Sequence, residues 1–127
     1  MQEYCNTFNL KIVVDPARVK EISEKSKKDV AAFFDGHTGE IVLGENPTLY
    51  EFLHEFCHFD QWDGMGRDMT RYHHPKLNTE WHREKYVRDL LMKEFQEHLT
   101  DDDLKHAEGY FKSVAEEVSR RFYGLPD

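Results

Sequence analysis

The residues best suited to chemistry lie in the stretch LYEFLHEFCHFDQW, residues 49–62, which reads as a helix. Because a helix turns by about 100° per residue, His54 and His58 lie about 40° apart on one face, and both imidazoles can reach one cation. Glu55 flanks that position. The alternative is a chance pattern on an ordinary helix surface, so the pattern needs support from the rest of the chain.

That support comes from a pair of glutamates in a later stretch, NTEWHREKYVRDLLMKEF, residues 78–95. At helical spacing, Glu80 and Glu84 share one stripe with Val87 and Leu91, so two carboxylates occupy a face that otherwise points inward. Buried acids are costly unless they bind something. Zinc in hydrolytic sites takes three protein ligands and leaves a fourth position for water, and this helix can supply the third. The alternative is that both glutamates lie on a solvent-exposed face of the helix and bind nothing.

The elements that must position these residues can be read from local patterns. Residues 8–15, FNLKIVVD, alternate and are β-branched, which predicts a strand, and Pro16 then opens a helix over ARVKEISEKSKK. Two short apolar runs surround DGHTG within residues 29–46, which predicts a β-hairpin. This hairpin leads directly into the helix that carries the histidines.

The expected histidine helix has a start signal and a stop signal. Thr48 as N-cap with Glu51 three positions later predicts a capping box, and the sequence DGMG at 63–66 ends the helix. A second cap is expected at Thr100, or at one of the acids that follow it. After the histidine helix we expect a loop over residues 64–78 and two helices, at about 79–98 and 101–122.

Composition limits the classes of function. The chain has 127 residues, 39% of them hydrophobic and 33% charged, which predicts one soluble domain over residues 1–127. Its formal net charge of −8 argues against a nucleic-acid partner. No stretch is long and apolar enough to span a membrane, and no signal peptide is evident, so a cytoplasmic protein is expected. Cys5 and Cys57 form no disulfide framework, and Cys57 is interpreted as a small buried hydrophobe.

The two helices together resemble a known group of enzymes. HExxH followed by a glutamate on a later helix, with an acid or amide four residues beyond it, is similar to the gluzincin metallopeptidases, here as HEFCH and EWHRE. More narrowly, the hairpin and TEWHREKYVRDLL resemble the minimal gluzincins and the ImmA/IrrE-type metallopeptidase domains of phages and mobile elements, over about residues 29–111. The resemblance implies a zincin-like α+β fold, in which a β-hairpin or three-stranded sheet packs on an active-site helix, with two C-terminal helices.

The resemblance also implies roles for individual residues. His54, His58 and Glu80 would bind Zn²⁺, Glu55 would be the general base, and Glu84 would accept a hydrogen bond from a ligand histidine. The activity implied is zinc-dependent hydrolysis of a peptide or protein substrate. The oligomeric state is not indicated.

The sequence departs from the ImmA/IrrE pattern on the second helix. That group usually has small residues and an Asn or Asp there, whereas this chain has Trp81, His82 and Glu84. The choice between Glu80 and Glu84 as the third ligand therefore stays open, with Glu80 preferred.

A tetrahedral intermediate also needs a donor for its oxyanion. Tyr110 on the last helix is preferred because it lies within the region of resemblance, and Tyr72, His73 and His74 in the loop are the alternatives. In zincins the strand before the motif helix pairs with an extended substrate, so an unpaired edge is expected for residues 39–44.

Two competing interpretations remain. One is a non-catalytic, zinc-stabilised binding module, such as a phage-encoded acidic inhibitor of a host protein. The other is a structural site with four protein ligands, closed by His73, His74 or His82. The presence of Glu55 argues against the first, because a purely structural site needs no base. The number of protein ligands on the metal separates the second from a catalytic site.

Overall fold

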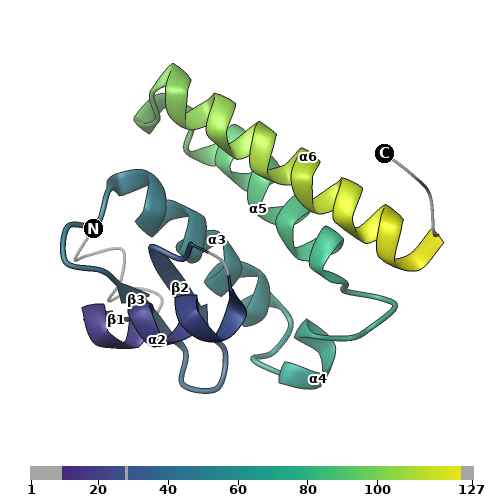
Figure 1. Cartoon of the computed structure of the whole chain (residues 1–127), viewed down its shortest axis with the longest axis horizontal. Coiled ribbons are helices and arrows are strands. Elements are labelled where there is room, and N and C mark those ends of the chain that lie inside the picture. The colour runs from purple at the N-terminus through teal and green to yellow at the C-terminus, as the bar shows by residue number, and fades with distance from the viewer. Residues whose placement is uncertain (1–9, 28, 124–127) are drawn as a thin grey trace. The chain divides into compact units, whose positions relative to one another are not determined.

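A computed structural model describes residues 10–27 and 29–123. The chain divides into two compact units, Met1–Asp60 and Gln61–Asp127, and helix α3 continues from the first unit into the second. Figure 1 gives the order of the elements along the chain. No described helix is both long and apolar enough to cross a membrane. The expectation of one domain over the whole chain stays a prediction.

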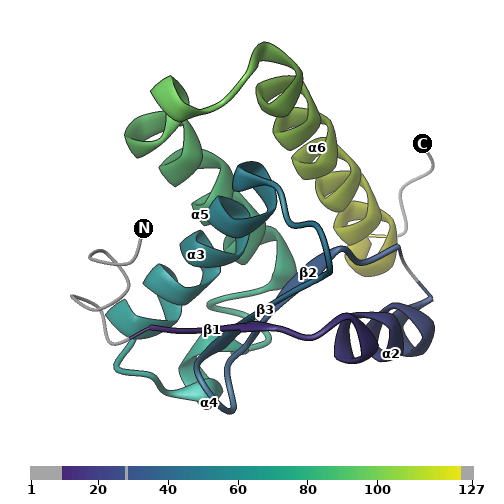
Figure 2. The same cartoon turned by 90° about the vertical axis from the view of Figure 1, so that its left-hand side faces the viewer.

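The first unit contains a three-stranded mixed sheet, which confirms the α+β class. Its order is β1 (Lys11–Val14), β3 (Glu40–Leu43), β2 (Ala32–Asp35), with β1 parallel and β2 antiparallel to β3 (Figure 2). Helix α2 (Pro16–Ser26) follows β1. The expected hairpin and first strand are thus confirmed in their described parts.

The central position of β3 corrects one prediction. Residues 39–44 were expected to carry an unpaired edge for substrate, but β3 pairs with β1 on one side and with β2 on the other. Its residues Ile41, Val42 and Leu43 are all buried, and such a continuous apolar run is typical of a strand covered on both faces. The pairing with β1 spans the α2 crossover, and no local pattern indicates a contact at that distance in sequence.

Helix α3 (Leu49–Gly64) begins and ends as predicted. Thr48 Oγ1 accepts from the Glu51 amide and Glu51 Oε1 accepts from the Thr48 amide, each over 3.1 Å, which confirms the capping box. Leu49 is 46% exposed, because it is the first residue of the helix. Three phenylalanines and one cysteine on this helix are buried, namely Phe52, Phe56, Phe59 and Cys57.

These buried side chains anchor α3 within the first unit. The ring of Phe59 meets that of Phe34 from β2 edge-on, at 6.1 Å between centroids. Cys57 has no exposed surface, as expected for a small hydrophobe, whereas Cys5 lies outside the described residues. The helix that carries the histidines is therefore held by its opposite face.

The second unit is helical. It comprises α4 (Met69–Tyr72), α5 (Glu80–Glu94), a 3₁₀ turn (Gln96–His98) and α6 (Asp101–Tyr123). The expected loop thus contains one helical turn, whose start is capped by the side chain of Asp68, an Asx-type cap that the loop prediction overlooked. Helices α5 and α6 lie side by side (Figure 1).

The start of helix α6 offers a test of local stability. Thr100 Oγ1 accepts from the Asp103 amide and Asp103 Oδ2 accepts from the Thr100 amide, each over 3.1 Å. Thr100→Ala should therefore lower the free energy of unfolding by about 1 kcal/mol. Urea denaturation measures this loss, and Thr100→Ser, which keeps the hydroxyl, is the control. Equal stability of the alanine and serine variants would contradict a capping role.

Candidate functional site

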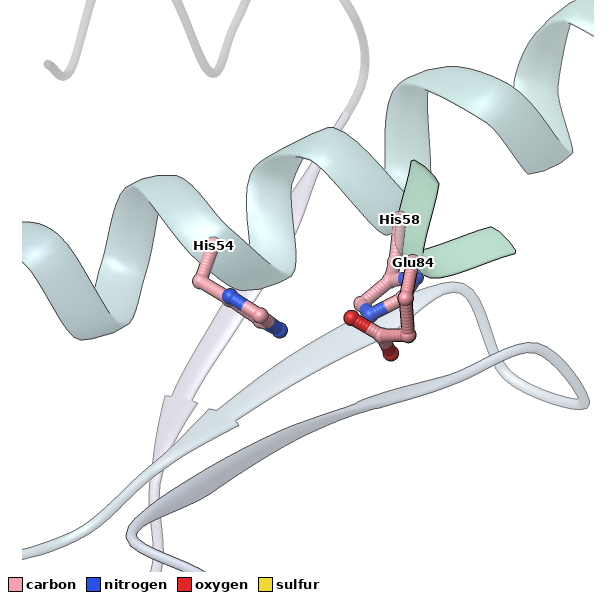
Figure 3. Close-up of side chains that lie close together, drawn as sticks. All are labelled: His54, His58 and Glu84. Carbon is pink, nitrogen blue, oxygen red and sulfur yellow. The ribbon is translucent and has the colours of Figure 1, made fainter. Parts of the chain in front are cut away.

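The two motif histidines project from one side of α3 (Figure 3). Their ring centroids lie 5.2 Å apart with the ring planes at 69°. His54 is partly exposed, and His58 is buried with 9% of its surface accessible. The spacing of four residues therefore does what helical geometry predicts, and two imidazole nitrogens come together at one place.

A carboxylate from α5 joins the two histidines. One ring nitrogen of His54, one of His58 and one carboxylate oxygen of Glu84 all lie within 4.8 Å of one another (Figure 3). Two imidazoles and a carboxylate are a preferred donor set of zinc, with metal–ligand bonds of about 2.0–2.2 Å. His54, His58 and Glu84 are therefore the residues that would hold such an ion.

Glu80, the residue preferred from the sequence as third ligand, is not in this group. It lies in the first turn of α5 and is partly exposed, whereas Glu84 lies one turn later and is 8% exposed. Val87 and Leu91, further along the same stripe, are fully buried, at 2% and 0%. The stripe predicted from the sequence is therefore buried from Glu84 onward. The greater burial of Glu84 distinguishes it from Glu80.

Other predicted residues lie on the expected elements. Glu55 follows His54 on α3 and is partly buried. Tyr110 lies on α6 with 40% of its surface exposed. Its role as oxyanion donor stays a prediction, as does that of Glu55 as general base.

The loop alternatives are engaged in other contacts. Nδ1 of His74 accepts from the backbone amides of Lys76 and Leu77, over 3.1 and 3.0 Å, so this nitrogen organises the loop and cannot donate to an oxyanion. The ring of Tyr72 is buried, and His73 packs edge-on against it at 4.9 Å. These contacts give Tyr72, His73 and His74 a structural role in the loop.

His82 likewise has a local role. Its Nδ1 accepts from the Thr79 amide over 3.2 Å and lies 2.8 Å from the Thr79 hydroxyl, which completes a capping box at the start of α5. Within the described part of the chain, the potential metal-binding group contains three residues and none of His73, His74 or His82. A site closed by a fourth histidine therefore finds no support here.

An α+β chain with HExxH on one helix and a carboxylate grouped with both histidines has the make-up of a metal-dependent peptidase. The chain belongs to the metallopeptidase toxin 4 family, whose sequence profile matches residues 2–116. Searches of curated proteins and of solved structures each returned no significant match. The chain is therefore a metallopeptidase that acts on protein and uses a metal ion. This outcome confirms the predicted enzyme class.

Proposed function

We propose that the metal is zinc and that His54, His58 and Glu84 hold it in a gluzincin-like arrangement. The observation that carries this proposal is the grouping of their three ligand atoms within 4.8 Å. Nitrogen and carboxylate oxygen donors suit zinc better than the all-oxygen surroundings that calcium or magnesium prefers. When bound, zinc supplies Lewis acidity that lowers the pKa of water and polarises a carbonyl group.

The residues of the chain would then divide the proton chemistry among them. Glu55, next to His54 on the same helix, accepts the proton of the attacking water and delivers it to the amine that leaves the cleaved peptide bond. Tyr110 is the candidate donor to the oxyanion that forms on the carbonyl. Its partial exposure on α6 leaves room for contact with substrate.

The choice of Glu84 over Glu80 can be tested directly. Glu84→Gln should weaken zinc binding by at least about tenfold, because the amide has no negative charge to offer the cation. Glu80→Gln makes the same chemical change one turn earlier and should change the affinity little. Competition with a chromophoric chelator measures both dissociation constants. The reverse ranking would transfer the ligand role to Glu80, as the sequence alone favoured.

The name of the family suggests the biological setting of this reaction. We propose that the substrate is a protein of a cell that the peptidase harms, and that cleavage occurs in the cytoplasm. A chain without a disulfide framework suits that reducing compartment. Induced expression in a bacterium should slow growth, and Glu55→Gln should restore it at equal protein level. Equal growth arrest by both proteins would show that harm does not come from hydrolysis.

A further inference from the structure

Asn78, which precedes the N-cap of α5, is almost fully buried, with 2% of its surface exposed. Its side-chain amide donates to the Tyr72 carbonyl over 2.6 Å and accepts from Nε2 of Gln61 over 3.3 Å. Its backbone amide donates to the His74 carbonyl over 3.1 Å, and its carbonyl accepts from Arg83 over 2.8 Å. One residue thus joins α3, the end of α4 and α5.

Two of these partners reinforce the arrangement. Arg83 also donates to the Tyr72 carbonyl over 3.4 Å, and its guanidinium lies 5.6 Å from the centre of the Tyr72 ring. Gln61 is itself buried, with 8% exposure. We call Gln61, Tyr72, Asn78 and Arg83 the Asn78 cluster. Buried polar networks of this kind depend strongly on geometry, because a shifted partner leaves polar groups poorly bonded in a medium of low dielectric constant.

The Asn78 cluster is attached close to the proposed metal ligands. Gln61 follows His58 by three positions, which is less than one turn of α3, and Arg83 immediately precedes Glu84 on α5. Apolar contacts between helices allow small sliding movements, whereas directional hydrogen bonds define one register. The cluster therefore ties the last turns of the histidine helix to the first turns of the helix that carries the third ligand.

We infer that Asn78 is a positioning residue for the metal site: it sets the register in which Glu84 meets His54 and His58. This inference rests on the proposed function, because it presupposes that these three residues bind the metal. Ligands must be held within about 0.5 Å of the productive geometry, and their supporting residues provide that precision. A purely structural role would instead stabilise the loop between α3 and α5 without affecting the affinity for metal.

The test compares metal affinity with stability in matched variants. Asn78→Ala and Gln61→Met should each raise the dissociation constant for Zn²⁺ by about tenfold. The double variant should bind about as weakly as the weaker single variant, because both substitutions break the same connection. Val114→Ala removes buried volume from α6 outside the cluster and serves as the control for lost stability. The visible spectrum of bound Co²⁺, which responds to ligand geometry, should change in the cluster variants and stay unchanged in Val114→Ala.

Affinities within about twofold of wild type in both cluster variants would overturn the inference, as would an equal loss of affinity in Val114→Ala. If Asn78→Ala does not fold, Gln61→Met decides, because it preserves side-chain volume and removes only the hydrogen bond to Asn78. A wild-type protein that binds no zinc would instead refute the proposed function. The two failures are therefore distinct.

Discussion

Glu55→Gln should leave the fold and the bound metal intact and lower the rate of peptide hydrolysis by roughly 10²–10⁴-fold. This is the range that a positioned general base contributes. Glutamine has nearly the same size and shape as glutamate, and position 55 is only partly buried, so packing should change little. The amide cannot accept the proton of the attacking water. An equal fall in kcat and kcat/KM would indicate an interaction made only in the transition state.

The measurement uses a diverse peptide library, with new termini identified by mass spectrometry. Glu94→Gln is the matched control, because it makes the same chemical change at an exposed position near the end of α5. Metal content is determined in parallel to verify that Glu55→Gln remains loaded. Cleavage at the same rate by wild type and Glu55→Gln would assign the activity to another base or to a contaminant.

The local parts of this fold and site could be predicted because their causes lie within a few residues. The capping box of Thr48 and Glu51 needs only a hydroxyl and a carboxylate three positions apart, and the structure contains it. The common face of His54 and His58 follows from helical periodicity alone. For the same reason the hairpin of β2 and β3 was found.

The parts that sequence reasoning missed depend on contacts between distant segments. The parallel pairing of β1 with β3 places residues 39–44 in the centre of the sheet, and a strand pattern does not specify its neighbour. Glu80 and Glu84 are equivalent on a helical stripe, so the proposal that Glu84 is the ligand rests on its deeper burial and on its place beside the two histidines. The apolar residues Val87 and Leu91 could have indicated which acid is the more buried, because Glu84 is closer to them in sequence than Glu80 is.

Metal binding should also affect stability, because the proposed ligands come from two helices that are distant in sequence. An ion that binds only the folded state stabilises that state by RT ln(1 + [metal]/Kd), about 4 kcal/mol at a free concentration 1,000 times Kd. For a chain of this length, 1 kcal/mol corresponds to a shift in Tm of roughly 2–6 °C. The stabilisation expected from zinc is therefore much larger than that from a helix cap.

Adding zinc to metal-free protein should accordingly raise Tm by on the order of 10–20 °C, as measured by thermal unfolding monitored by circular dichroism. In His54→Ala the same addition should have little effect, because the cation loses one of its three protein ligands. His54 is partly exposed, so the loss of packing in this variant is small and its metal-free Tm should stay near that of the wild type. Equal zinc-induced shifts in both proteins would mean that the ion binds elsewhere. An unchanged wild-type Tm, with metal analysis verifying that zinc is removed and restored, would show that the bound ion does not tie α3 to α5.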